Sequence, residues 1–292
     1  FAAVLEEGTK VLAPGPHYPP YMAYPQMFGA ETIEYQLHSN DGWKPDFSDI
    51  AEKMDDSVRL LVLINPNNPC GTVCGADDID ALLEIARRYP NCIVVADEIY
   101  DGLDFTGEHV SVASRSDDVP VVALNGVSKV YYAPGWRIGY MALHDPTKRM
   151  GLVRDGLERL LRSRLCASTP AQVGYLAGLE HDRGWMETYS ERVLRRRDHC
   201  LKRIAQIDGL EVEQPGGAFY MFVRLTDERW ANDDKAFVLQ LLHEEHVLLV
   251  HGSGFSPQLG KGHVRLVYLV TLEVLDEVFD RIERFLKKHR GH

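Results

Sequence analysis

Short apolar runs, each ending in polar residues, recur through the first half of this chain. Runs this short and this apolar are typical of strands that are buried on both faces. Helical stretches such as Asp77–Tyr89 separate them. This alternation predicts an α/β fold in which crossover helices connect the strands of a mostly parallel sheet. The runs lie near residues 10–13, 60–64, 93–96, 119–124 and 138–143.

The pattern changes beyond residue 145. Helical periodicity covers residues 146–165, 169–179 and 185–207, and the last of these stretches is long and amphipathic. We therefore predict a large domain at residues 1–180, followed at residues 181–292 by a linker helix and a smaller α+β domain. In the smaller domain we expect strands at 210–213, 218–223, 247–250 and 264–268, and helices at 234–245 and 272–289.

Lys129 follows the apolar run that ends at Leu124, and Arg137 lies beyond it in Gly-Trp-Arg-Ile-Gly. Polar residues directly after a buried strand line the carboxyl edge of an α/β sheet, where ligands bind. A lysine can form a Schiff base with an aldehyde, and an arginine can bind a phosphate through two hydrogen bonds. The pair therefore indicates pyridoxal 5'-phosphate, which carries both an aldehyde and a phosphate. The alternative is that the lysine and the arginine are surface charges with a structural role only.

Two other apolar runs end in residues that suit the same cofactor. Asp97 ends the run that starts at Ile93, and Tyr100 follows it closely. A carboxylate can hold the proton of a pyridine nitrogen, and a tyrosine hydroxyl can donate to a phenolic oxygen. Asn68 lies in the turn Asn-Pro-Asn-Asn-Pro-Cys-Gly, where the prolines restrict the backbone. The plainer alternatives are that Asp97 caps the next helix and that the asparagine segment is only a turn.

These motifs, taken in order, resemble those of the class I and II aminotransferases, which belong to the fold-type I pyridoxal-phosphate enzymes. The set is highly specific in this order and spans almost the whole chain. The residues around Lys129 and Arg265 are most similar to the alanine (glutamate–pyruvate) aminotransferase branch. The matching segments are Asn-Pro-Asn-Asn-Pro-Cys-Gly, Ala-Asp-Glu-Ile-Tyr, Ser-Lys, Gly-Trp-Arg-Ile-Gly-Tyr, Pro-Gly-Gly-Ala-Phe-Tyr and Gly-His-Val-Arg-Leu.

The resemblance implies a role for each of these residues. Lys129 would bind the cofactor aldehyde as a Schiff base and later move a proton between substrate and cofactor. Asp97 would pair with the pyridine nitrogen, while Tyr100 and Asn68 would bind the phenolic oxygen. Arg265 would hold the substrate α-carboxylate through two hydrogen bonds, a geometry that a lysine cannot copy, and Asn68 would assist it.

Further positions concern the phosphate and the ring. Arg137 would bind the phosphate, and Tyr18, in Gly-Pro-His-Tyr-Pro, would stack on the ring unless it only fills a surface turn. The family often places a phosphate-binding hydroxyl where this chain has Gly126, so we expect Ser128 to contribute instead. The family also has a glycine-rich phosphate turn and a partner-reaching tyrosine, both N-terminal to the position that matches residue 1 of this chain. We therefore expect that an N-terminal part is missing and that residues 1–8 continue a helix.

Composition and charge fit an enzyme that acts on small molecules. The chain has 292 residues, enough to bury a large core, and its formal charge of -11 argues against nucleic acid or anionic membranes as partners. The basic face of the helix at 185–207 is expected to be solvated. No apolar run reaches the length of a membrane span. The five cysteines lack the paired spacing of a zinc site, so we expect no metal and reduced thiols in the cytoplasm.

We predict a pyridoxal-phosphate-dependent aminotransferase that acts as a homodimer on an amino acid and a 2-oxo acid. No second arginine is evident for a distal carboxylate, so alanine is the favoured donor, aspartate the next, and 2-oxoglutarate the acceptor. Two alternatives remain open. A carbon–sulfur lyase on the same fold would use Lys129, Asp97 and Arg265 in the same way. A ligand-binding module without catalysis would have no chemical need for Lys129.

Overall fold

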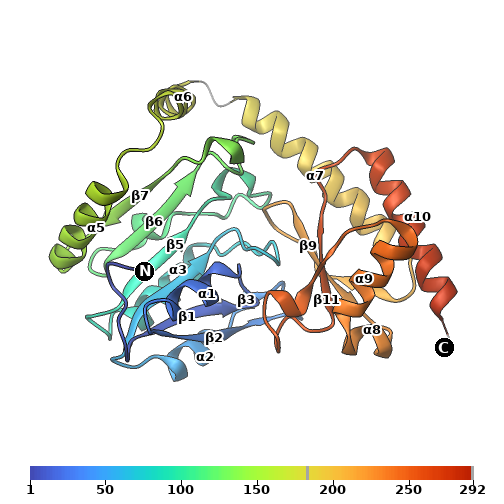
Figure 1. Ribbon diagram of the computed structural model, residues 1–292, viewed down its shortest axis with the longest axis horizontal. Helices are drawn as coiled ribbons and strands as arrows, with labels where there is room; N and C mark the ends of the chain where they lie inside the picture. Colours follow the sequence, from blue (N-terminus) through green and yellow to red (C-terminus); the bar gives the residue numbers. More distant parts are fainter. Residues whose placement is uncertain (182–183, 291–292) are drawn as a thin grey trace.

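The computed structural model describes residues 1–181 and 184–290 and contains two sheets (Figure 1). The larger has the strand order β3-β2-β1-β4-β5-β6-β7 and the smaller has the order β10-β11-β9-β8. The predicted α/β class with a mostly parallel sheet is thereby confirmed. The strands are β1 (Lys10–Gly15), β2 (Glu31–His38), β3 (Lys44–Pro45), β4 (Val58–Ile64), β5 (Ile93–Asp97), β6 (Val121–Gly126), β7 (Gly139–His144), β8 (Leu210–Val212), β9 (Tyr220–Leu225), β10 (Val250–His251) and β11 (His263–Val267).

The central strands of the large sheet are buried on both faces. In β4, Leu61 and Leu63 pack in a core that includes α3, whereas Leu60 and Val62 pack with α1 and α5. Successive side chains point to opposite faces of a strand, which is why both sets are apolar. The α-helices are α1 (Pro20–Gln26), α2 (Phe47–Lys53), α3 (Ala76–Ala86), α4 (Val112–Arg115), α5 (Gly151–Arg164), α6 (Thr169–Glu180), α7 (Gly184–Ile204), α8 (Glu228–Asn232), α9 (Asp234–Glu245) and α10 (Leu272–His289). None of the helices in the described part of the chain is long and apolar enough to cross a membrane.

Strand direction brings several loops to one edge of the large sheet. β1, β2, β4, β5 and β6 run parallel, while β7 pairs antiparallel with β6 and β3 antiparallel with β2. Ile64 pairs with Asp97, and Asp97 pairs with Leu124, so β4, β5 and β6 end close to one level. The loops after these strands therefore meet at the carboxyl edge, which is where α/β sheets bind ligands.

The small sheet is antiparallel, and its two faces differ. Val264 and Leu266 of β11 belong to a core that also contains residues of α9 and α10. Arg265 lies between them on the opposite face, directly across from Phe222 of β9. Phe222 packs edge-on against Trp43 of the large domain, with ring centroids 5.3 Å apart. The face that carries Arg265 is therefore turned toward the large domain.

The cores of the two parts interlock. Tyr100 and Leu103, which follow β5, belong to the core of the small sheet, and Phe222 and Phe255 belong to a core of the large sheet. Helix α7 runs along both parts (Figure 1). Core residues from each part therefore pack into the other part. The division into two domains near residue 180 is still our proposal.

Three local expectations are wrong. Residues 1–8 form turns rather than a helix: Leu5 N donates to Phe1 O at 2.9 Å, and Gly8 has a φ of 82°. A single turn is too short to be a stable helix without further packing. The strand expected at 247–250 is reduced to Val250–His251, because Val247 and Leu249 are buried in the core as loop residues.

The basic face of α7 is also less solvated than expected. Arg197 is buried and donates to the carbonyl oxygen of Pro215 at 3.0 Å. Arg203 pairs with Asp276 and Asp280 of α10, at 2.7 and 2.6 Å. Part of this face therefore fastens α7 to the rest of the small domain, a use that periodicity alone does not distinguish from solvation.

Candidate active site

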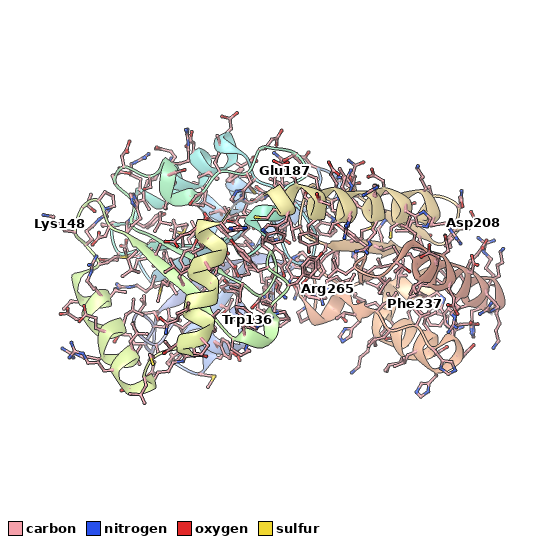
Figure 2. The ribbon with its side chains drawn as sticks, turned by 90° about the horizontal axis from the view of Figure 1, so that it is seen from above. Trp136, Lys148, Glu187, Asp208, Phe237 and Arg265 are labelled. Carbon is pink, nitrogen blue, oxygen red and sulfur yellow. The ribbon has the colours of Figure 1, made fainter. Side chains whose placement is uncertain are left out.

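The predicted site residues come together at the carboxyl edge of the large sheet, facing β11. Asp97 is the last residue of β5, Asn68 follows β4 and Lys129 follows β6. Arg265 reaches this edge from the small domain and lies where the two lobes meet (Figure 2). The site thus combines side chains from parts of the chain that are far apart in sequence.

Asp97 is partly buried, and its side chain accepts a hydrogen bond from one side chain of the described residues. The hydroxyl of Tyr21, in α1, donates to Asp97 Oδ2 at 2.7 Å, and Ile99 N donates weakly to Oδ1 at 3.4 Å. Burial raises the pKa of Asp97, and the hydrogen bond from Tyr21 opposes this rise. A buried carboxylate of this kind is stabilised further by a positively charged partner. The geometry suits a protonated pyridine nitrogen.

Asn68 is held by the loop that contains it. Asn65 closes this loop, because its side chain donates to Cys74 O and accepts from Cys74 N, each at 2.9 Å. Gly217 N donates to Gly71 O at 2.8 Å and joins the loop to the small domain. The Asn68 amide is buried, and its oxygen accepts a hydrogen bond from Arg265 Nη1 at 2.8 Å. The asparagine segment is thus a rigid platform as well as a turn.

Arg265 bonds to Asn68 and packs between two aromatic rings. Its guanidinium carbon lies 4.5 Å from the ring centroid of Tyr220 and 4.7 Å from that of Phe255. With Nη1 bonded to Asn68, Nε is buried and has no hydrogen-bond partner within residues 1–181 and 184–290. Burial lowers the pKa of Arg265. A partly buried guanidinium with N–H groups left unpaired is a strong site for a carboxylate.

Tyr100 is buried next to this group. Its hydroxyl lies 2.9 Å from the hydroxyl of Tyr220, the first residue of β9, and either oxygen can be the donor. Burial, together with Tyr220, raises the pKa of Tyr100 well above its ordinary value. Tyr100 therefore keeps its proton at neutral pH and can act as a hydrogen-bond donor.

Lys129 is half-buried and lies among charges of both signs. Its Nζ is 5.9 Å from the ring centroids of both Tyr100 and Phe219. Burial lowers its pKa, and the positive charges of Arg265 and Arg137 lower it further, while Asp97 acts in the opposite sense. A lysine with a lowered pKa is neutral more often, as a nucleophile or base must be.

The segment after Lys129 is more open. Arg137 is exposed, has a left-handed φ of 53°, and donates from Nη1 to Pro134 O at 2.6 Å. Ser128 is partly exposed beside Lys129. Gly126 has no room for a side chain, because a Cβ there would lie 2.9 Å from both Gly139 Cα and Ile138 O. Close pairing of β6 with β7 thus explains why the hydroxyl typical of the family is absent.

Tyr18 lies at the rim and is 45% exposed, with its ring centroid 6.4 Å from that of Tyr21. We did not single out Tyr21 or Tyr220 from the sequence. Tyr21 lies in α1, whereas Tyr18 precedes this helix, so helical spacing does not relate the two side chains. Tyr220 stands in a motif of the family, but its contacts depend on how the two domains pack.

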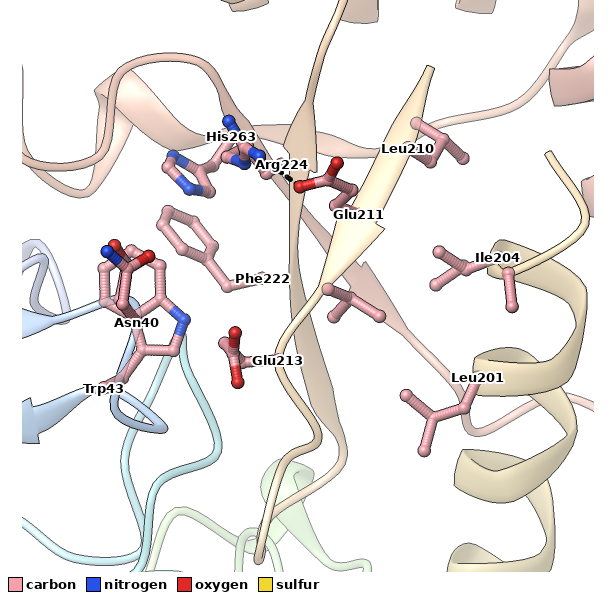
Figure 3. Close-up of a pocket in the computed structure, with 13 residues that line it drawn as sticks. Asn40, Trp43, Leu201, Ile204, Leu210, Glu211, Glu213, Phe222, Arg224 and His263 are labelled. Atoms are coloured by element: carbon pink, nitrogen blue, oxygen red, sulfur yellow. Dashed lines mark hydrogen bonds and ion pairs between the residues drawn. The ribbon is translucent and has the colours of Figure 1, made fainter. Parts of the chain in front are cut away.

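A separate hollow of about 480 Å³ lies beside the small sheet (Figure 3). Trp43, Phe222 and His263 form one wall, where the rings of His263 and Phe222 stack at 4.9 Å. Arg224 and Glu211 form an ion pair in the same hollow. None of the predicted site residues lines it. The Asp97–Arg265 group, and not this hollow, therefore remains the candidate site.

Comparison with known proteins gives a consistent result. A family model described as aminotransferase class I and II matches residues 1–282. The glutamate-pyruvate aminotransferase AlaA of Haemophilus influenzae is 35% identical, over 99% of this chain and 72% of that protein. An alanine aminotransferase of Mycobacterium tuberculosis is 32% identical, over 99% of this chain and 68% of that protein. The structure of alanine aminotransferase from Pyrococcus furiosus superposes with a TM-score of 0.95 and 43% identity, covering 98% of this chain and 72% of that one.

Proposed function

This chain belongs to the class I and II aminotransferases, which depend on pyridoxal 5'-phosphate, and we propose that it transfers the amino group of alanine to 2-oxoglutarate. The family establishes that the substrates are an amino acid and a 2-oxo acid. The finer choice rests on the names of the similar enzymes and on Arg265. The position of its guanidinium, bonded to Asn68 at the edge that also carries Lys129, is the single observation that carries the proposal, because its remaining N–H groups can bond a substrate carboxylate.

We propose that the cofactor binds between the residues after β4, β5 and β6. Asp97 would hold the proton of the pyridine nitrogen, and Tyr100 and Asn68 would bind the phenolic oxygen. Arg137, with Ser128, would bind the phosphate. The position of the Asp97 carboxylate at the end of β5 supports this orientation, and burial, which raises its pKa, makes a positively charged neighbour favourable there. Tyr18 would cover the open face of the ring.

When bound, the cofactor withdraws electrons from the substrate α-carbon. Lys129 would hold the cofactor aldehyde and then, as a free amine, move the proton at that carbon. The lowered pKa of Lys129 supports both tasks, because each requires a neutral nitrogen. Arg265 and Asn68 would hold the carboxylate so that the α-hydrogen points to Lys129 Nζ.

Aromatic rings border Arg265, and we propose that the donor side chain beside it is small and uncharged. Aromatic rings of Tyr220 and Phe255 lie against the guanidinium. The charged groups that influence the pKa of Lys129 are Arg265, Arg137 and Asp97, and we have assigned each of them another role. We find no further cation dedicated to a distal carboxylate among these groups, so alanine is favoured over aspartate.

A donor screen on the full-length protein tests this proposal. Each amino acid is supplied with 2-oxoglutarate, and glutamate formation is followed. Alanine should give the largest kcat/KM, and aspartate should follow. Strong preference for aspartate would overturn the substrate choice but not the family. Pyruvate formed without any 2-oxo acid would instead indicate a carbon–sulfur lyase.

We also propose that the active unit is a cytoplasmic homodimer. Helices α5 and α6 expose several large apolar side chains, which supports a subunit interface there: Leu152, Leu160, Leu161, Val173, Leu176 and Leu179. Sedimentation of the full-length protein at working concentration measures this directly, and an active monomer would refute it.

A further inference from the structure

We infer that Tyr220 is a positioning residue that couples the two ligand contacts of the site, joining Tyr100 to Arg265. The inference rests on the proposed function, because it assigns Tyr100 to the phenolic oxygen of the cofactor and Arg265 to the substrate carboxylate. Tyr220 would touch neither ligand itself. Its hydroxyl contacts the first of these residues and its ring face contacts the second.

Sheet register puts Tyr220 beside Arg265. In the antiparallel pair of β9 and β11, Arg265 stands opposite Phe222, and Tyr220 is two residues away on the same strand as Phe222. Side chains two residues apart share a face, so Tyr220 and Arg265 are diagonal neighbours. The ring is buried and the guanidinium carbon lies 4.5 Å from its centroid. A cation this close to an aromatic face is held by the charge distribution of the ring.

The hydroxyl bond crosses from one domain to the other. Tyr100 follows β5 of the large sheet, whereas Tyr220 begins β9 of the small one, and their oxygens are 2.9 Å apart. If Tyr100 donates its own proton to the cofactor, it must accept the proton of Tyr220 in this bond. A chain of two hydroxyl groups then ends on the phenolic oxygen. Each bond in such a chain strengthens the next, because each donor is polarised by the one behind it.

This arrangement predicts an effect on the bound cofactor. A phenolic oxygen that receives a strong hydrogen bond carries negative charge more easily and attracts nearby protons less. Weakening the chain should therefore move the pH midpoint of the visible absorption of the cofactor to higher pH. Tyr100→Phe removes the direct donor, whereas Tyr220→Phe removes only the group behind it, so the second shift should be smaller.

The test is a spectral pH titration of the purified holoenzyme and its variants. We expect Tyr220→Phe to raise the midpoint by about 0.5 pH unit, and Tyr100→Phe to raise it by more than about 1 unit. Tyr268→Phe is the matched control, because Tyr268 is another buried tyrosine of the small domain, whose hydroxyl bonds only weakly, to Ala218 O at 3.4 Å. It should leave the midpoint unchanged.

Steady-state kinetics test the other contact. Tyr220→Phe keeps the ring and should leave the KM for alanine within about twofold, while Tyr220→Leu, checked for folding by circular dichroism, should raise it about fivefold. A shift with Tyr100→Phe but none with Tyr220→Phe would overturn the inference and leave the proposed function intact. The same holds if Tyr220→Phe raises KM as much as Tyr220→Leu. A wild-type protein with no cofactor band attached to Lys129 would overturn both.

Discussion

We call Asn68, Asp97, Tyr100, Tyr220 and Arg265 the buried half of the site: Asn68, Tyr100 and Tyr220 are buried, Asp97 and Arg265 are partly buried, and each of the five has a partner. We call Ser128, Lys129 and Arg137 the exposed half, because the first two are partly exposed and Arg137 is exposed. In the buried half, Arg265 bonds to Asn68, Tyr220 lies against Tyr100, and Asp97 accepts from Tyr21. In the exposed half, Arg137 donates to Pro134. Lys129 lies beside the buried half, with its Nζ 5.9 Å from the ring centroids of both Tyr100 and Phe219.

The difference separates two physical tasks. Binding a pyridine nitrogen and a carboxylate requires hydrogen-bonding groups that are held in fixed orientations. Side chains that are already ordered lose little conformational entropy when the ligand binds. Forming and breaking a covalent link requires a side chain that can move, and a half-buried lysine retains this freedom. We therefore expect substitution of Lys129 to abolish chemistry, and substitutions in the buried half to weaken recognition or stability in graded steps.

The largest effect should come from Lys129→Ala. The change removes both the group that binds the cofactor aldehyde and the base that moves the α-proton, so turnover should fall by about 10⁴-fold or more. Lys148→Ala, at an exposed lysine of the same domain, is the control and should keep wild-type turnover. Borohydride reduction followed by peptide mapping should find the cofactor on Lys129. An adduct on a different lysine would remove the basis for the comparison.

A smaller effect is expected for Arg265→Lys. An ammonium cannot bond to Asn68 and also hold a carboxylate in two parallel hydrogen bonds, so KM should rise about thirtyfold for every amino acid donor. The cofactor spectrum should not change, because Lys129 and Asp97 remain. Arg224→Lys, on the neighbouring strand β9 and ion-paired with Glu211, is the matched control. A change confined to one donor, or loss of the cofactor, would show that Arg265 does not hold the shared carboxylate.

The ends of buried strands could be predicted from sequence alone. Asn68, Asp97 and Lys129 each follow an apolar run, and parallel pairing forces such positions to one edge of a sheet. Strand β2 was not predicted, because its charged residues alternate with partly buried ones near the edge of the sheet. Sequence periodicity is weak in such a strand, since only one of its faces is well buried.

Contacts between the domains could not be predicted from the sequence. The role of Tyr220 depends on the register of β9 with β11 and on where Tyr100 meets the small domain, and no local pattern encodes either. The absence of a hydroxyl at Gly126 was visible, but its cause was not. The structure supplies that cause in the close approach of Gly139. Long-range packing thus decided the parts of the buried half that sequence reasoning missed.

The smallest effect, and the finest test of a pre-ordered buried half, is expected for Tyr21→Phe in the cofactor-free protein. Burial raises the pKa of Asp97 above 3.8, while the Tyr21 hydroxyl opposes that rise. A carboxyl group whose pKa is raised by folding holds its proton more tightly in the folded state. Its ionisation therefore costs stability as the pH rises from the unfolded pKa through the folded one.

Without the hydroxyl, the pKa of Asp97 should rise further, so the stability deficit of Tyr21→Phe should grow as the pH rises. Urea unfolding should show the deficit reaching about 1–2 kcal/mol between about pH 4 and about pH 7. Tyr24→Phe, at an exposed tyrosine of the same helix, should show no such growth. A deficit of the same size at every pH would mean that Tyr21 contributes packing alone. The Tyr21 hydrogen bond would then not order Asp97 before the cofactor binds. Asp97 would resemble Lys129 in this respect, and the proposed difference between the two halves of the site would not hold for Asp97.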